Sequence, residues 1–181
     1  MALPQAKQDA TEARLAAVSR PAKGAAWAET ARDEALARVR SMGLPHRRDE
    51  YWKFTTPDSL VQSEAPTAAV HVSDETNTFD DVDKLQIVFV DGVFDAAASD
   101  ELTLEGVKVE RLVDAVKTDI HWAKDVYGVL EERGQDPVAR PLAALNTALA
   151  SDGVVIKRDV QPPGRVWRDT PPAQSVAWKY P

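Results

Sequence analysis

Cysteine is absent from the 181 residues of this chain. Its absence excludes disulfides, thiolate metal sites and a cysteine nucleophile. Because nothing points to an oxidising compartment, we expect the protein in the cytoplasm. No apolar run approaches the ~18 residues that a membrane helix requires. The start of the chain, "MALPQAKQDATEARLAAV", lacks the basic and then apolar stretches of a signal peptide. The composition, 44% hydrophobic and 28% charged, is typical of a soluble globular protein.

Motifs that support catalysis or nucleotide binding are also missing. The sequence contains no Gly-x-Ser-x-Gly element, no P-loop and no Gly-x-Gly-x-x-Gly element. Its three histidines, His46, His71 and His121, lack a second histidine at metal-ligand spacing. His46 near Asp49 and Glu50 offers at best a weak metal site, and we expect His121 at a helix start or in a surface contact. The sequence therefore predicts no enzyme, and no metal or cofactor in this chain.

Charge is distributed unevenly along the chain, whose formal net charge is -7. Residues 61–160 carry nine Lys or Arg against twenty Asp or Glu, whereas the segments on either side are each slightly basic. An acidic middle repels phosphate backbones, so a nucleic acid partner is not expected.

The first sixty residues have a helical pattern. In "AAWAETARDEALARVRSMG" the apolar residues recur at helical spacing and form one face: Trp27, Ala31, Ala35, Val39 and Met42. Gly43 can end this helix and Pro45 prevents its continuation, while Glu34 and Arg38 form an i,i+4 pair on the exposed side. A shorter helix is expected over residues 11–19. Residues 1–60 are thus predicted to form a helical arm.

The middle of the chain changes to strand-like patterns. In "KLQIVFVDGVF", Asp91 and Gly92 separate two apolar runs, which is a strong signal for a two-residue hairpin turn and explains both residues without a catalytic role. A short strand is expected over 107–109, a helical turn over 112–116 and a helix over 122–133. Together these elements predict a small α+β region.

The stretch "PLAALNTALASDGVVIKR" combines a helix with a strand. Leu142, Leu145 and Leu149 have helical spacing, and the Asp-Gly pair that follows ends the helix. Residues 154–156 form a continuous apolar run, which is typical of a strand buried on both faces.

After Arg158 the composition changes, because residues 159–181 contain five of the twelve prolines. Proline prevents a helix or a central strand, so this tail is expected to be extended or disordered, with Trp167 and Trp178 docking separately. The sequence thus divides into a helical arm at 1–60, an α+β region at 61–158 and a tail at 159–181.

Three blocks resemble, in the same order, the N-terminal region of the SufB/SufD family, the scaffold subunits of the SUF iron–sulfur cluster assembly system. These blocks are "GLPHRRDEYWKFTTPDSL", "IVFVDGVF" and "PLAALNTALASDGVVI", within residues 25–158. The first is the most specific. The resemblance implies a helical N-terminal region, a right-handed parallel β-helix and a C-terminal region that docks the SufC ATPase. The expected fold class is therefore α+β, with 154–156 as the first strand of a truncated β-helix.

The resemblance also implies a function and partners. Full-length relatives are non-catalytic scaffolds that assemble with SufB-like and SufC-like proteins, and they run to roughly twice this length because a solenoid needs many rungs. We expect this chain to lack those assembly contacts and to form no stable three-component complex. The alternative is a free-standing interaction module that acts through its helical arm or its proline-rich tail. A second copy covering the unpaired strand at 154–156 would give a homodimer.

The first block has two interpretations. Arg47, Arg48, Tyr51 and Trp52 could contact a partner subunit, with the arginines as forked donors and the tryptophan as an apolar anchor. Alternatively, Tyr51, Trp52 and Phe54 could pack the helical arm onto the β region. Because aromatic side chains are core formers first, the sequence favours the packing interpretation.

Overall fold

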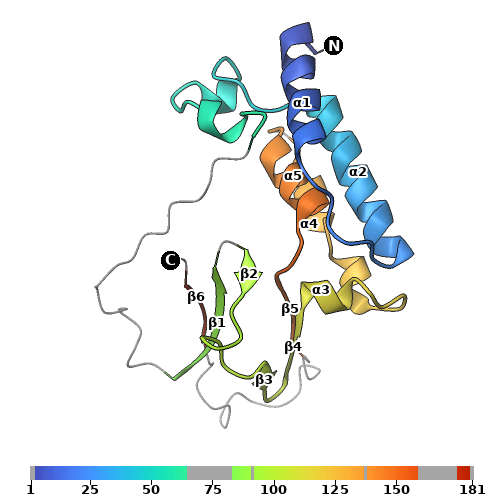
Figure 1. Cartoon of the computed structure of the whole chain (residues 1–181), viewed down its shortest axis with the longest axis vertical. Helices are drawn as coiled ribbons and strands as arrows, with labels where there is room; N and C mark the ends of the chain where they lie inside the picture. The colour runs from blue at the N-terminus through green and yellow to red at the C-terminus, as the bar shows by residue number, and fades with distance from the viewer. Residues whose placement is uncertain (1–2, 65–82, 91, 137, 159–174, 180–181) are drawn as a thin grey trace. The chain divides into compact units, whose positions relative to one another are not determined.

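The computed structural model describes residues 3–64, 83–90, 92–136, 138–158 and 175–179 (Figure 1). The contacts between residues divide the chain into two compact units, and each unit combines two separate segments of the sequence. Unit 1 comprises Met1–Thr67 and Ala115–Ser151, and unit 2 comprises Ala68–Asp114 and Asp152–Pro181. Helices and small sheets occur together, which confirms the α+β class. The division of the chain into a helical arm at 1–60, an α+β region at 61–158 and a tail at 159–181 stays a prediction.

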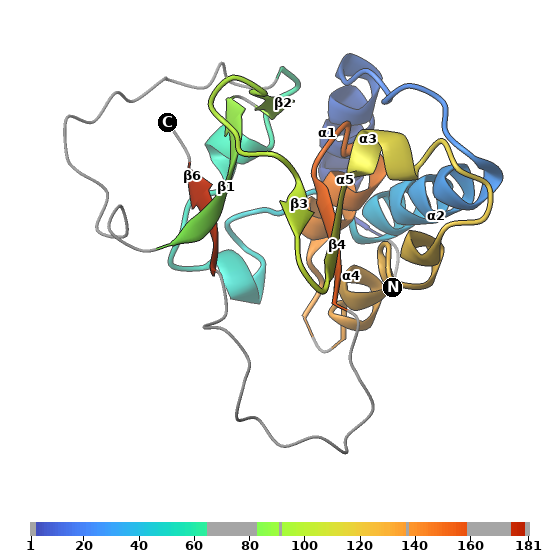
Figure 2. The same cartoon turned by 90° about the horizontal axis from the view of Figure 1, so that it is seen from below.

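Unit 1 is built around three helices, α1 (Gln5–Ala17), α2 (Ala26–Met42) and α5 (Pro141–Leu149). The helices α1, α2 and α5 lie together in both views (Figures 1 and 2). Small residues allow α2 and α5 to approach closely: Ala35 on α2 packs with Ala148 on α5, and both are fully buried. The predicted end of α2 is confirmed, since Gly43 has φ +64° and donates its N–H to the Val39 carbonyl.

Two details of the predicted helical arm are wrong. The first helix runs from Gln5 to Ala17 rather than over 11–19. Thr11 is its only buried residue, so the sequence has no apolar periodicity that would mark where this helix begins and ends. Arg38 also does not pair with Glu34. Its guanidinium instead binds Glu131 of α4 (Val129–Arg133), with 2.6 Å between Nη2 and Oε2.

The predicted helix over 122–133 is interrupted. A 3-10 turn covers Trp122–Asp125, and α4 begins only after Gly128, whose φ of +77° is incompatible with a continuous right-handed helix. His121 caps the 3-10 turn, because its Nδ1 accepts the N–H of Ala123 at 3.1 Å. Its predicted place at a helix start is therefore confirmed.

Unit 2 contains two three-stranded sheets, and the first has the order β2–β1–β6. Strand β1 (Lys84–Val90) pairs with β2 (Val93–Phe94) through Val90 and Val93, and Gly92 has φ +78°. The predicted two-residue hairpin is thus confirmed. Strand β6 (Ser175–Lys179) runs parallel to β1, so this part of the tail is an extended edge strand. The expected docking of Trp167 lies outside the described residues.

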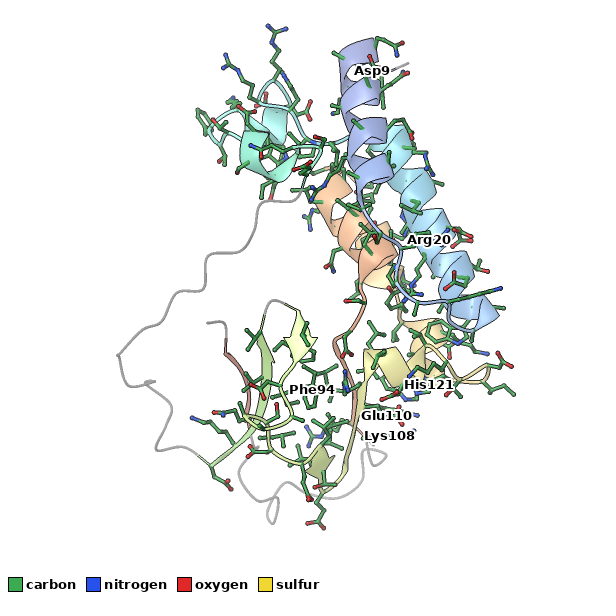
Figure 3. All side chains as sticks on the ribbon, in the orientation of Figure 1. Asp9, Arg20, Phe94, Lys108, Glu110 and His121 are labelled. Atoms are coloured by element: carbon green, nitrogen blue, oxygen red, sulfur yellow. The ribbon has the colours of Figure 1, made fainter. Side chains whose placement is uncertain are left out.

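The second sheet is antiparallel throughout, with the order β3 (Thr103–Leu104), β4 (Val107–Arg111) and β5 (Val154–Arg158). On β4, Lys108 and Glu110 form an ion pair of 2.7 Å, and both are labelled in Figure 3. The β3–β4 hairpin was not predicted, although Gly106 in its turn has φ +72°, close to the +78° of Gly92. Helix α3 (Leu112–Ala115) follows β4 directly and confirms the predicted helical turn.

The expected burial of the 154–156 strand on both faces is wrong. Strand β5 lies at the edge of its sheet and pairs with β4 alone among the described strands. Val154 and Val155 are half-buried and Ile156 is 39% exposed. The core of unit 2 lies instead around Leu85, Ile87 and Val109. That β5 begins a parallel β-helix stays a prediction.

None of the helices in the described part of the chain is long and apolar enough to span a bilayer.

Candidate functional site

The candidate site is the segment 43–62 that follows α2, which we call the aromatic loop. It contains two one-turn 3-10 helices, Glu50–Trp52 and Asp58–Leu60, and is drawn in teal beside α1 in Figure 1. Leu44 anchors its start by packing into the core with Val39 and Ala144. Pro57 is also buried, so the loop is held at its start and near its end.

Helix α1 fixes the aromatic loop from the side. Three hydrogen bonds join them, Lys7 Nζ to Asp49 Oδ2 at 2.8 Å, the Leu44 N–H to Thr11 Oγ1 at 2.9 Å, and Arg14 Nη1 to the Gln62 carbonyl at 3.1 Å. The α1 residues are spaced by four and by three, so they share one face of the helix. Helix α1 therefore acts as a support for the loop.

Asp49 organises the base of the loop. Its Oδ2 accepts the Lys7 ammonium and the His46 N–H at 3.0 Å, and its own N–H bonds the His46 carbonyl at 2.8 Å. Partial burial opposes ionisation, but these hydrogen bonds outweigh it and lower the pKa of Asp49. The carboxylate is thus ionised and committed to holding the loop.

The weak metal site considered at His46 is not assembled. His46 Nδ1 accepts the Arg48 N–H at 3.2 Å, and Asp49 is occupied by Lys7. Within the described ranges, no group of three or more His, Asp or Glu side chains is arranged to hold a metal ion. His71 lies outside those ranges.

The aromatic rings of the loop are not core residues. Tyr51 is 64% exposed and Phe54 is 92% exposed, whereas Trp52 is half-buried. Tyr51 and Trp52 contact each other edge to face, with ring centroids 6.2 Å apart. Tyr51 and Phe54 therefore do not belong to the core of unit 1. That the rings pack the arm onto the β region stays a prediction. Tyr51 and Trp52 are consecutive in one 3-10 turn, which presents successive side chains to different sides, so Trp52 is half-buried while Tyr51 is exposed.

The two arginines of the loop, Arg47 and Arg48, are exposed. The neighbouring carboxylates are already used, because Asp49 binds Lys7 and Glu50 binds Lys53 at 2.8 Å. Neither guanidinium forms an ion pair within the part of the chain that the structure describes. The four residues predicted as a partner contact thus lie together on one loop, and two of them carry uncompensated positive charge.

A cavity of about 380 Å³ lies elsewhere in unit 1, between α1, α2 and α5. Its floor is apolar, with Leu15, Leu36 and Leu149, and Arg20 at its rim pairs with Asp33 at 2.8 Å. Arg20 is labelled in Figure 3. The cavity is a gap between helix side chains, and the carboxylate in its lining, Asp33, is already paired with Arg20. The aromatic loop is therefore the stronger site.

The family described as "SufBD protein N-terminal region" matches residues 21–158. The chain belongs to this family. The match includes α2, the aromatic loop, α3 to α5 and strands β1 to β5, and it leaves α1 and β6 outside. The resemblance to the SufB/SufD family that the sequence blocks indicated is thus confirmed.

Two relatives of known description are similar to parts of the chain. The iron–sulfur cluster assembly protein SufD of Escherichia coli (strain K12) is 29% identical, over 61% of this chain and 29% of SufD. DNA ligase B of Pseudomonas fluorescens (strain Pf0-1) is 36% identical, over 25% of this chain and 10% of the ligase. The chain therefore spans less than a third of the length of either relative. The family and the SufD similarity together identify a SufD-like N-terminal portion.

Proposed function

We propose that this chain is a non-catalytic, SufD-like scaffold component of iron–sulfur cluster assembly, and that the aromatic loop is one of its protein-contact surfaces. The exposure of Phe54 and Tyr51 carries the proposal. Water contact with large aromatic rings is unfavourable, and aromatic and arginine side chains are enriched where partners bind. The family match over residues 21–158 supplies the biological setting.

A scaffold role agrees with the chemistry of the loop. Each acidic or imidazole group at its base already has a structural partner: Asp49 binds Lys7, Glu50 binds Lys53, and His46 accepts the Arg48 N–H. A general acid or base must be free to exchange protons with a substrate. These pairings favour a binding role for the base of the loop over proton transfer.

The partners that we propose are SufB-like and SufC-like proteins. A loop with two exposed rings contributes only part of a stable interface, which buries about 1,200–2,000 Å² in total. We therefore expect a weak binary contact through the loop, and we retain the expectation that this portion alone builds no stable three-component complex.

The experiment is a binding titration of the purified chain against SufB-like and SufC-like proteins from the same source. Saturable binding to one of them with a Kd of about 1–100 μM supports the proposal, since this range corresponds to about 5–8 kcal/mol. No binding to either protein at several hundred micromolar, on the order of 4–5 kcal/mol, would overturn it. That result would favour the alternative, a free-standing interaction module outside cluster assembly.

A further inference from the structure

We infer that the aromatic loop recognises an acidic face of a partner protein, with Arg47 and Arg48 supplying the charge and Tyr51 and Phe54 the apolar contact. The inference rests on the proposed function, because it names the kind of partner that the same surface fits. It commits the loop to a protein surface that combines carboxylates with an apolar patch.

The charge balance of the loop supports an acidic partner. Its two carboxylates nearest the arginines are neutralised within the chain, Asp49 by Lys7 and Glu50 by Lys53. Arg47 and Arg48 therefore remain as uncompensated positive charges at an exposed surface. Arginine presents a planar fork of donors that matches a carboxylate in two hydrogen bonds, so carboxylates are its natural protein partners.

The aromatic part of the loop is already partly organised for contact. The Lys53 ammonium, bound to Glu50, lies 5.0 Å from the centroid of the Phe54 ring, and Tyr51 rests edge to face on Trp52. The contact with Trp52 restricts the Tyr51 ring, and both Tyr51 and Phe54 keep most of their surface open. A restricted ring loses less conformational entropy on binding, which favours its use as an anchor.

The support from α1 reinforces this organisation. Hydrogen bonds from α1 fix the start, base and end of the loop at Leu44, Asp49 and Gln62. The backbone that carries the arginines is therefore preset before a partner arrives. Preorganisation of this kind lowers the ordering cost of association.

A nucleic acid is the less favoured occupant, although arginine and aromatic side chains also bind bases and phosphates. The chain carries a formal net charge of -7, and residues 61–160 carry nine Lys or Arg against twenty Asp or Glu. A chain with a net negative charge repels a phosphate polymer at long range, whereas a protein partner can confine its carboxylates to the contact.

The test compares variants in a titration against the SufB-like protein at about 50 mM and about 300 mM salt, which changes the screening length roughly 2.5-fold. The double reversal Arg47→Glu/Arg48→Glu is the principal variant. The control Lys23→Glu/Arg133→Glu makes the same total charge change at two exposed residues outside the loop. Phe54→Ser tests the apolar contact, and Arg47→Gln/Arg48→Gln removes charge without reversing it. A single-stranded oligonucleotide serves as the competing probe.

We expect the double reversal to weaken binding at least about tenfold at low salt and to reverse its salt dependence, because glutamates facing carboxylates repel and salt screens that repulsion. The glutamine pair should lose less, and Phe54→Ser should weaken binding about tenfold, as loss of an interface anchor does, while keeping the salt dependence. The control should change binding by less than about twofold.

Three results would overturn the inference. In the first, the wild-type chain binds the SufB-like protein, and neither the double reversal nor the glutamine pair weakens this binding more than the control does. The loop then does not recognise an acidic face of the partner, although the proposed function stands. In the second, the wild type binds the oligonucleotide through the arginines and does not bind the protein, so the ligand of the loop is a nucleic acid and not an acidic protein face. If the wild type binds neither the SufB-like nor the SufC-like protein, the proposed function fails with it.

Discussion

Thr11 on α1 is the buried contact that most directly links this helix to the aromatic loop. Its side chain is almost fully buried, at 1% exposure. Oγ1 donates to the Lys7 carbonyl at 2.7 Å and accepts the Leu44 N–H at 2.9 Å. Thr11→Val keeps the shape of the side chain and removes both hydrogen bonds. The substitution therefore isolates the polar link from the packing.

The expected cost follows from the group that is left behind. In Thr11→Val the Leu44 N–H stays buried and loses its acceptor, and an unsatisfied buried donor costs about 1–3 kcal/mol. For a chain of this size, each kcal/mol lowers the melting temperature by about 2–4 °C. We expect Thr11→Val to reduce the free energy of unfolding by about 2 kcal/mol.

Thr11→Ser is the matched control, because it keeps the hydroxyl and deletes one methyl group, worth about 0.8 kcal/mol. Denaturant unfolding measures both variants, and amide hydrogen exchange reports on the Leu44 N–H itself. Exchange at Leu44 should be faster in Thr11→Val and close to wild type in Thr11→Ser. A Thr11→Val protein as stable as wild type, with a protected Leu44 amide, would refute the link between α1 and the loop.

Three further outcomes are expected. Arg32→Ala should destabilise the chain by about 3–5 kcal/mol in denaturant unfolding, because Arg32 is 1% exposed and pairs with Glu29 at 2.8 Å; a loss under about 1 kcal/mol would contradict this. Asp49→Asn should lose stability at neutral pH. Despite partial burial, hydrogen bonds from Lys7 and His46 lower the pKa of Asp49 below its ordinary value, so the stability that it contributes is complete above that ordinary value and is lost as the pH falls through the lower folded pKa. The unfolding curves of mutant and wild type should therefore converge in acid. Half-buried Trp52, replaced by alanine, should cost less than the about 3 kcal/mol of a core aromatic in a thermal melt.

The sequence predicted the elements whose signals lie within their own residues. Helix α2 has a continuous apolar face ending at Gly43, and the first hairpin has Asp-Gly between two apolar runs, so both could be placed without knowing their neighbours. The β3–β4 hairpin was missed because Glu105-Gly106 is a weaker turn signal than Asp-Gly and because β3 is only two residues long, with one of them polar.

The elements that failed depend on contacts between distant residues. The VVI run of β5 has the composition of a central strand, but its pairing with β4 at the edge of a sheet leaves Ile156 partly exposed. In the aromatic loop, composition cannot distinguish a core aromatic from a contact aromatic. That distinction depends on α1, whose hydrogen bonds reach residues 33 to 48 positions away.

The most direct test of the central claim is amide hydrogen exchange of the chain with and without the SufB-like protein. The central claim is that the aromatic loop is an exposed contact surface which a partner covers. We therefore predict that binding slows exchange of the amides in 46–56 and leaves the α2–α5 core unchanged. Slower exchange confined to the strands of unit 2, with the loop unaffected, would contradict the claim.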